Sequence, residues 1–248
     1  MSFAATPDFA GQVTVVVPVK NEADNIAQLV QEIHTALEGR TDFELIYVDD
    51  GSTDATPQRL AEARARFPRL RVLHHRRSCG QSTALATAAR AARHPWIATL
   101  DGDCQNDPAD IPALLAAVSA GRRTPGLELV AGWRNKRHDS SLRKLSSKVA
   151  NGVRGGLLGD RTPDTGCGLK VFSRDLYLRL PFFDHQHRFL PALFLRQGAQ
   201  VVSVPVNHRP RTQGRSKYGV HNRLWVGIVD LFGVMWLQRR MTHPVLEE

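Results

Sequence analysis

Short runs of apolar, largely β-branched residues alternate with segments of helical periodicity through the first two thirds of this 248-residue chain. The apolar runs at residues 13–17, 43–48, 71–73, 96–100 and 127–131 predict five strands. Between them, apolar residues recur at spacings of three and four, which predicts helices. Strands that alternate with helices in this way predict an α/β fold.

Three of the predicted helices have identifiable starting points. The first follows Asn21, a residue type that caps helices. An alanine-rich helix is expected at residues 82–92. Asp107-Pro108 predicts another start, because proline at the first position gives up an amide that has no partner there. The apolar face of the first helix consists of Ile26, Leu29, Val30, Ile33 and Leu37.

The character of the chain changes after Gly132. A helix expected at 139–158 has one apolar stripe and basic residues on its other faces. A strand at 201–206 leads to a basic loop at 208–218 and then to an apolar segment at 224–237. We therefore divide the chain into a sheet domain at residues 1–207 and a tail at 208–248, which holds the basic loop and the apolar helix.

The formal net charge of +9 predicts a polyanionic partner: nucleic acid, an anionic membrane or a phosphorylated substrate. Nucleic acid is disfavoured, because the chain has no recognised binding module and few aromatic residues among its arginines. Cys79, Cys104 and Cys167 lack the spacing of a disulfide framework or a zinc site, and favour a reducing cytoplasm. No signal peptide or membrane-spanning run is visible, so we expect a soluble or peripheral protein.

Carboxylates stand where three of the predicted strands end, at Glu22, at Asp50 and at Asp101-x-Asp103. In open α/β sheets, ligands bind beyond the carboxyl ends of the strands. Two carboxylates one residue apart suit Mg²⁺ or Mn²⁺, which keep few protein ligands and complete their shell with diphosphate and water. Gln105 continues the alternation and can add an amide oxygen.

The segments at these strand ends resemble the successive motifs of the family 2 glycosyltransferases. They read PVKNE at 18–22, VDDGSTD at 48–54 and DGDCQ at 101–105. More narrowly, they resemble the dolichol-phosphate mannose synthase and polyprenyl-phosphate glycosyltransferase branch, and the likeness covers nearly the whole chain. Lys20 departs from the tyrosine that members often carry at its position.

The resemblance implies a GT-A fold, with a mixed, mostly parallel sheet flanked by helices, and inversion at the anomeric carbon of the transferred sugar. It implies a nucleotide diphosphate sugar, UDP- or GDP-linked, as the donor. It also implies Mg²⁺ or Mn²⁺ as cofactor, held by Asp101, Asp103 and Gln105. The residues expected to bind the nucleotide sugar are Pro18, Val19, Asn21, Glu22, Asp50, Asp101 and Asp103.

Later basic motifs match the same branch. They are GWR at 132–134, Arg143 with Ser147 one helical turn later, DTGCGLK at 164–170 and RTQGRSKY at 211–218. Guanidinium groups bind phosphate oxygens in pairs, so this set predicts a clamp for an acceptor phosphate. Lys170 replaces an arginine of the branch and lacks its planar fork, which makes it a weaker candidate. The expected phosphate ligands are Arg134, Arg143, Ser147, Arg211 and Lys217.

A phosphate acceptor would also determine the chemistry. A sugar hydroxyl needs a general base to remove its proton, whereas a phosphate monoester already has an anionic oxygen near neutral pH. The enzyme then needs orientation and charge neutralisation more than a base. Asp103 and Arg134 are the expected catalytic residues. Asp164 stands where a hydroxyl-using relative would place its base, and a structural turn carboxylate is an equal alternative.

The apolar segment at 224–237 has tryptophans near both ends, Asp230 as its only charge and basic residues on its flanks. A helix of this length is about 21 Å long, short of a hydrocarbon core of about 30 Å. These features predict an amphipathic helix in the interface of an anionic membrane. A buried core helix or a subunit contact is the alternative.

Together, these patterns predict an inverting, metal-dependent glycosyltransferase that moves a sugar to a polyprenyl phosphate of the dolichyl or undecaprenyl type. The sugar would be a hexose such as mannose or glucose, or a derivative. The enzyme would work peripherally on the cytoplasmic face of the membrane, with a second copy of itself or an integral-membrane protein as candidate partners. The competing prediction is a transferase that acts on a hydroxyl of a soluble glycan or cell-envelope polysaccharide.

Overall fold

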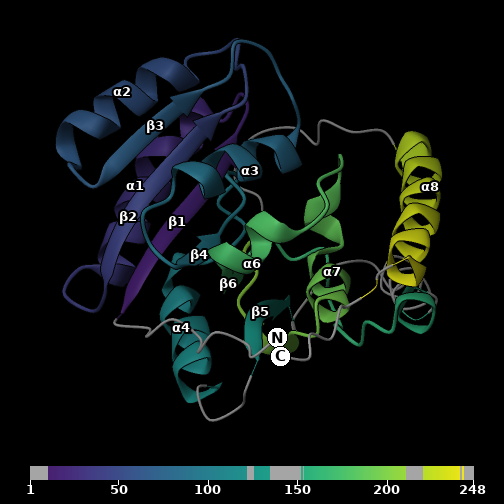
Figure 1. Ribbon diagram of the computed structural model, residues 1–248. Helices are drawn as coiled ribbons and strands as arrows, with labels where there is room; N and C mark the ends of the chain where they lie inside the picture. Colours follow the sequence, from purple (N-terminus) through teal and green to yellow (C-terminus); the bar gives the residue numbers. More distant parts are fainter. Residues whose placement is uncertain are drawn as a thin grey trace, which may run out of the picture.

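The computed structural model describes residues 11–121, 126–134, 152, 154–210, 220–240 and 242. Its centre is a seven-stranded sheet with the strand order β3-β2-β1-β4-β6-β5-β7 (Figure 1). The strands are β1 (Gln12–Val19), β2 (Asp42–Asp49), β3 (Leu70–His74), β4 (Trp96–Thr99), β5 (Leu127–Arg134), β6 (Lys170–Ser173) and β7 (Gln200–Val206). The helices are α1 (Ala23–Leu37), α2 (Thr56–Arg66), α3 (Gln81–Ala91), η1 (Pro108–Asp110), α4 (Ile111–Ala120), α6 (Arg174–Arg179), η3 (Gln186–Arg188), α7 (Leu190–Arg196) and α8 (Val220–Arg239).

The sheet is mixed and mostly parallel, as expected. β1 pairs in parallel with β2 and β4, β2 with β3, and β5 with β7. β6 runs antiparallel to both of its neighbours, β4 and β5. The register sets Thr99, the last residue of β4, beside Lys170, the first residue of β6. The segment that precedes β6 therefore lies at the edge of the sheet where β4 ends.

Both faces of the sheet are buried, which explains the near-continuous apolar runs of its strands. Successive side chains of a strand point to opposite faces. Accordingly, Val13, Val15 and Val17 of β1 lie in one apolar cluster, with α1, α2 and α4. Val16 lies in the other cluster, with α3, α6 and α7. The five strands predicted from these runs are all present.

Asn21 does not cap α1, contrary to the sequence prediction. It adopts a positive φ of 51°, which asparagine tolerates better than most residues. Its Oδ1 accepts a hydrogen bond from the Thr53 amide at 2.8 Å. Glu22 occupies the N-cap position and makes no side-chain capping bond. The side chain of Asn21 thus joins two loops instead of closing a helix end.

The helix start predicted at Asp107-Pro108 is present, but its first turn is a 3-10 helix and not an α-helix. The Asp107 side chain accepts a hydrogen bond from the Ala109 amide, and Pro108 follows at the first position. The turn that results is the 3-10 helix η1, and α4 begins only after it.

The C-terminal helix α8, drawn in yellow in Figure 1, is longer than the apolar segment that predicts it. It packs on the second apolar cluster through the fully buried Val234 and the partly buried Leu231 and Met235. Arg196 Nε donates to the Leu237 carbonyl at 3.0 Å, and Asp230 Oδ2 lies 3.1 Å from His185 Nδ1. One side of α8 is therefore fixed to the sheet domain.

The opposite side of α8 is also apolar and faces outward. Trp225, Val229, Phe232 and Trp236 follow one another at spacings of four, three and four, and are 69%, 67%, 63% and 59% exposed. Residues at these spacings lie on one face of a helix. Among the described residues, no helix combines the length and apolar character that crossing a bilayer requires.

His187 predicts a pH dependence of stability. Burial, helped by the nearby positive charges of Arg188 and Lys170, lowers its pKa to about 3 from an ordinary value of 6.5. The unfolded chain therefore binds one more proton than the folded chain between these pH values. The stability that comes from keeping His187 uncharged is therefore fully present above pH 6.5. As pH falls from 6.5 toward about 3, the free energy of unfolding decreases by about 1.4 kcal/mol per pH unit.

Urea unfolding at pH 7.5 and pH 5 will measure this loss. His187→Asn, which keeps an acceptor near Ser82 Oγ (2.8 Å from His187 Nδ1), is expected to be less stable at pH 7.5 and to lose less stability on acidification. An equal pH response in the two proteins would contradict the assignment to His187.

Candidate functional site

The loops that follow β1 and β2 are joined by hydrogen bonds at the carboxyl edge of the sheet. The Asn21 amide donates to Ser52 Oγ at 2.9 Å, and Asn21 Oδ1 accepts from Thr53. The Glu22 amide donates to Thr56 Oγ1 at 2.9 Å. These contacts bring two of the three predicted donor motifs into one surface.

Two glycines let the third motif approach its neighbours. A Cβ atom on Gly102 would lie 2.5 Å from Val19 Cγ1 and 3.3 Å from the Pro18 carbonyl oxygen. A Cβ atom on Gly168 would overlap the carboxylate of Asp101. The loop after β4 is therefore held between the end of β1 and the segment at 164–170.

Asp101 and Asp103 follow β4 in this loop. Gln81 Nε2, at the start of α3, donates to Asp101 Oδ1 at 2.8 Å, and Asp103 Oδ1 accepts from the Gln105 amide at 3.2 Å. Partial removal from water raises the pKa of Asp101, and the negative charge of Asp103 raises it further. The fold thus holds two carboxylates close enough to repel each other.

A hard divalent cation fits this arrangement. Two carboxylates and the side-chain amide of Gln105 are oxygen donors of the kind that Mg²⁺ and Mn²⁺ prefer. A cation between Asp101 and Asp103 would relieve the repulsion that raises the pKa of Asp101. The role of Asp101, Asp103 and Gln105 as metal ligands stays a prediction.

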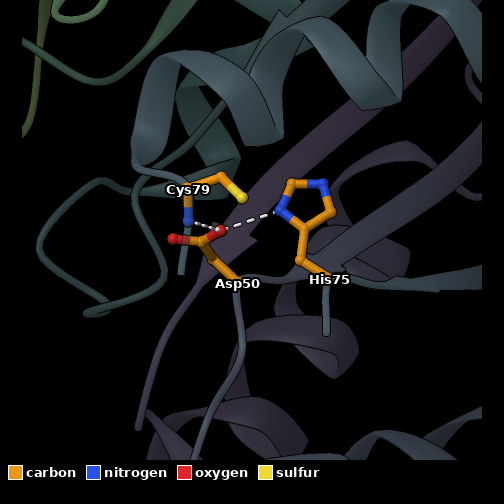
Figure 2. A group of neighbouring side chains, drawn as sticks. All are labelled: Asp50, His75 and Cys79. Atoms are coloured by element: carbon orange, nitrogen blue, oxygen red, sulfur yellow. Dashed lines mark hydrogen bonds and ion pairs between the residues drawn. The ribbon is translucent and has the colours of Figure 1, made fainter. Parts of the chain in front are cut away.

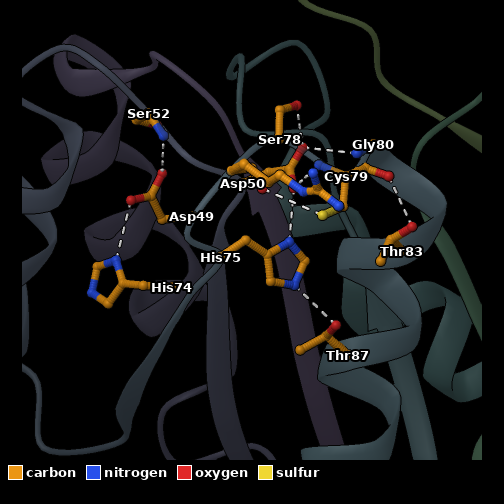
Figure 3. Close-up of polar contacts among 11 residues, drawn as sticks. Asp49, Asp50, Ser52, His74, His75, Ser78, Cys79, Gly80, Thr83 and Thr87 are labelled. Carbon is orange, nitrogen blue, oxygen red and sulfur yellow. Dashed lines mark hydrogen bonds and ion pairs between the residues drawn. The ribbon is translucent and has the colours of Figure 1, made fainter.

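Asp50, buried at the end of β2, accepts several hydrogen bonds. Its Oδ1 accepts from the Cys79 amide at 2.8 Å and lies 2.7 Å from His75 Nδ1 (Figure 2). Its Oδ2 accepts from the Ser78 hydroxyl at 2.7 Å and the Gly80 amide at 2.9 Å (Figure 3). Burial would raise the pKa of Asp50, but these bonds outweigh it and lower that pKa. The carboxylate is therefore charged and fixed in orientation.

The preceding residue, Asp49, has a different set of partners. Its Oδ1 accepts from the Ser52 amide at 3.0 Å, and its Oδ2 lies 3.1 Å from His74 Nδ1 (Figure 3). Asp49 thus shapes the loop after β2, whereas Asp50 faces the start of α3.

Arg134, the last residue of β5, forms a bidentate ion pair with Asp164. Its Nε and Nη2 lie 2.6 and 2.8 Å from the two carboxylate oxygens, and its amide lies 3.3 Å from Oδ2. Burial opposes the charged guanidinium, but the hydrogen-bonded carboxylate outweighs burial and raises the pKa of Arg134. The guanidinium is therefore charged, and both oxygens of Asp164 face it.

The segment at 164–170 connects this ion pair to the loop after β4 that carries Asp101 and Asp103, called the aspartate loop below. At one end it carries Asp164, and farther along Gly168 touches Asp101. The Gly168 carbonyl accepts from Thr99 Oγ1 at 2.7 Å. The charges of Asp101 and Arg134 act on each other's pKa values, each favouring the charged form of the other. The predicted metal ligands and the first predicted acceptor arginine therefore share one site.

Lys170 points into this segment. Its ammonium group is buried and donates to the carbonyls of Thr165 and Cys167. Burial lowers the pKa of Lys170, and the nearby negative charges offset this only in part. The residue identified as a weaker site candidate thus supports the loop from within.

The start of the basic loop predicted at 208–218 lies against the aspartate loop. The Arg209 amide donates to the Gln105 carbonyl at 2.9 Å. The Arg209 side chain binds Glu32 at 2.6 Å and Asp107 at 2.7 Å. Arg143, Ser147, Arg211 and Lys217 lie outside the described residues, and their places in the clamp stay predictions.

Sequence reasoning missed Gln81, which holds Asp101, and the group around Asp50 that includes His75 and Cys79. Gln81, His75 and Cys79 are not carboxylates, so the pattern of acidic residues after apolar strands did not include them. The available signal was their place between a predicted strand and the alanine-rich helix, since such a loop comes to the same edge of the sheet.

Residues 14–180 match the family model described as glycosyl transferase family 2. The chain is 36% identical over 241 residues to a dodecaprenyl-phosphate galacturonate synthase of Rhizobium johnstonii, covering 94% of this chain and 69% of that protein. It is 31% identical over 211 residues to an undecaprenyl-phosphate 4-deoxy-4-formamido-L-arabinose transferase of Edwardsiella ictaluri, covering 84% and 63%. This chain is thus shorter than both relatives.

A crystal structure of glucosyl-3-phosphoglycerate synthase from Mycobacterium tuberculosis, in complex with Mn²⁺, UDP and glucosyl-3-phosphoglycerate, superimposes with a TM-score of 0.67. The match covers 94% of this chain and 81% of the other, at 20% sequence identity. The two proteins share a fold, and the GT-A-like architecture expected from the sequence is confirmed.

Proposed function

Because this chain belongs to glycosyl transferase family 2, we propose that it transfers a sugar from a nucleotide diphosphate sugar to a polyprenyl phosphate, with inversion at the anomeric carbon. Two relatives whose names specify such lipid phosphates, dodecaprenyl and undecaprenyl, support this acceptor. They also favour a bacterial-type lipid over the dolichyl type.

On the donor side, we assign the nucleoside to the surface formed by the loops after β1 and β2. Pro18, Val19, Asn21, Glu22 and Asp50 lie there. Asp101 and Asp103 then face the diphosphate, with Gln81 orienting Asp101. A Mg²⁺ or Mn²⁺ ion held by Asp101, Asp103 and Gln105 would neutralise charge on the departing diphosphate.

On the acceptor side, the link made by the 164–170 segment supports the proposal most strongly. It sets Arg134 near Asp101, so a phosphate bound by Arg134 would lie close to the donor's diphosphate. We assign Arg143, Ser147, Arg211 and Lys217 to the same phosphate, on the sequence motifs alone. Two anions brought together in this way need the cationic surroundings that these residues provide.

The acceptor phosphate oxygen attacks the anomeric carbon, and the bond from that carbon to the nucleoside diphosphate breaks. No proton needs to be removed from an anionic oxygen, so a general base is dispensable. Asp164 then serves as a positioning residue that fixes Arg134 through two hydrogen bonds. This role differs from both readings that the sequence left open for Asp164, a general base and a structural turn carboxylate.

The exposed apolar face of α8 supports work at a membrane surface. Four large apolar side chains point outward along one stripe, and Arg240 lies beside the stripe, 5.9 Å from the Trp236 ring. Aromatic residues with a basic border are typical of helices that lie in a membrane interface. We assign this face to the cytoplasmic leaflet, where the lipid acceptor would be presented.

The double variant Trp225→Ser/Phe232→Ser is expected to bind vesicles of anionic lipid about 30-fold more weakly. Partial burial of two aromatic side chains contributes about 2 kcal/mol, which corresponds to that factor. The melting temperature should change little, because both side chains are exposed. Vesicle co-sedimentation will measure the effect, with Leu178→Ser on α6 as the control; equal binding of both variants would contradict the assignment.

The proposed activity is tested with radiolabelled UDP- and GDP-sugars, Mn²⁺ and a detergent-solubilised polyprenyl phosphate. Label is expected in the organic phase, as sugar linked to the lipid. Transfer to soluble glycans with none to any polyprenyl phosphate would overturn the proposal in favour of a hydroxyl acceptor.

A further inference from the structure

Asp50, His75 and Cys79 form a group with three different metal-binding atoms. A carboxylate oxygen, an imidazole nitrogen and the Cys79 sulfur all lie within 4.8 Å of one another (Figure 2). Asp50 follows β2, His75 follows β3, and Cys79 precedes α3. The fold therefore collects these side chains from three separate segments at one point.

Two of the three ligands are already held in place by other groups. Asp50 is fixed by the Ser78 hydroxyl and the Gly80 amide. His75 Nε2 lies 3.0 Å from Thr87 Oγ1, which sets the plane of the ring (Figure 3). Outer hydrogen bonds of this kind orient the ligands of protein metal sites and determine which imidazole nitrogen is protonated.

Cys79 is the adjustable member of the group. Its side chain is exposed, and its thiol donates to the Arg77 carbonyl at 3.3 Å. Zn²⁺ bonds of about 2.0–2.3 Å in a tetrahedral site set the ligand atoms about 3.5 Å apart. A cation in this group would therefore widen the 2.7 Å contact between Asp50 Oδ1 and His75 Nδ1, and the exposed Cys79 side chain would turn to meet it.

The ligand types distinguish this group from the aspartate pair after β4. Thiolate and imidazole favour Zn²⁺ and chemically similar ions such as Co²⁺, whereas the all-oxygen set of Asp101 and Asp103 favours Mg²⁺ or Mn²⁺. On binding, the Cys79 thiol would lose its proton to solvent. The His75 proton now shared with Asp50 would move to Nε2, facing Thr87.

We propose that Asp50, His75 and Cys79 bind one Zn²⁺-type cation, with water completing its shell, and that this cation excludes the nucleoside of the donor. The second part rests on the proposed function, in which Asp50 holds the nucleoside. A cation that takes the Asp50 carboxylate leaves it unavailable to the donor. Zn²⁺ thus inhibits the enzyme in competition with the nucleotide sugar, even with Mn²⁺ in excess.

The site is tested first without any substrate. The full chain, purified free of metal and supplied with excess Mg²⁺, is titrated with Co²⁺. One equivalent is expected to give the absorbance of a cobalt–thiolate bond in a tetrahedral site, and Zn²⁺ is expected to displace it. Absence of that absorbance would overturn the metal site.

Three variants locate the bound ion. Cys79→Ser is expected to abolish the thiolate absorbance, and His75→Asn to weaken Co²⁺ binding at least about tenfold. His74→Asn is the matched control, since His74 is the adjacent histidine and pairs with Asp49 instead. An absorbance that persists in Cys79→Ser, or is lost equally in His74→Asn, would contradict the proposed ligands.

A second set of measurements distinguishes a failure of the metal site from a failure of the proposed function. Adding UDP or GDP is expected to displace Co²⁺, and Zn²⁺ is expected to raise the KM for the donor without changing kcat. Cobalt binding that neither nucleotide displaces would overturn the assignment of Asp50 to the nucleoside and leave the metal site standing. An active transferase that binds no cobalt would overturn the metal site alone.

Discussion

Replacing Asp103 with asparagine is expected to lower turnover by about 10³-fold and to leave the fold intact. Asparagine keeps the shape of the side chain and an oxygen for the Gln105 amide, but it removes the negative charge. Charge stabilisation at a cation site contributes several kcal/mol to catalysis, and about 4 kcal/mol corresponds to this loss in rate. Initial rates at saturating donor and acceptor will measure it.

Mn²⁺ binding to the purified variant, followed by electron paramagnetic resonance, gives a second reading that does not depend on turnover. It is expected to weaken, while the melting temperature stays close to that of the parent. Asp42→Asn is the control, because Asp42 lies at the opposite end of β2 from the site. Full activity of Asp103→Asn would remove Asp103 from the metal site.

Replacing Arg134 with alanine is expected to reduce both stability and acceptor use. The change leaves the buried carboxylate of Asp164 without its bidentate partner, which costs about 3–5 kcal/mol of folding free energy. It also removes a cation proposed to bind the acceptor phosphate, with an expected 10²–10³-fold loss in kcat/KM for the lipid. Chemical unfolding and acceptor kinetics will measure the two effects separately.

The double variant Arg134→Ala/Asp164→Ala distinguishes a structural from a catalytic role. Removing both partners leaves no unpaired charge from this ion pair, so most of the lost stability should return. Acceptor use should stay low, because the guanidinium is still missing, and donor binding by calorimetry should change little. Recovery of parental activity in the double variant would show that Arg134 acts only through folding.

The part of the fold that sequence reasoning found is the part with long apolar runs. The strands at 13–17 and 43–48 are buried on both faces and could be recognised from their continuous apolar runs. β6 was missed, because it has only four residues and begins with Lys170. Its strand conformation depends on pairing with β4 and β5, which no local pattern reports.

The same distinction holds for the candidate site. Asp101 and Asp103 could be found because they follow a recognisable strand at a spacing suited to a cation. Gln81 and His75 carry only the weaker signal of their place between a predicted strand and a predicted helix. Gln81 reaches Asp101 through the packing of α3 on the sheet, and His75 reaches Asp50 through the pairing of β3 with β2. The role expected of Asn21 in capping failed for a related reason: a contact with a distant loop outweighed a local one.

The antiparallel insertion of β6 has a mechanical consequence. Thr99 and Lys170 are adjacent in the sheet, so the strand that leads to the aspartates and the strand that leaves the Arg134–Asp164 segment form one rigid unit. A hinge between the proposed donor and acceptor sites would have to break this pairing. Under the proposed function, this pairing sets the spacing between the donor and acceptor sites.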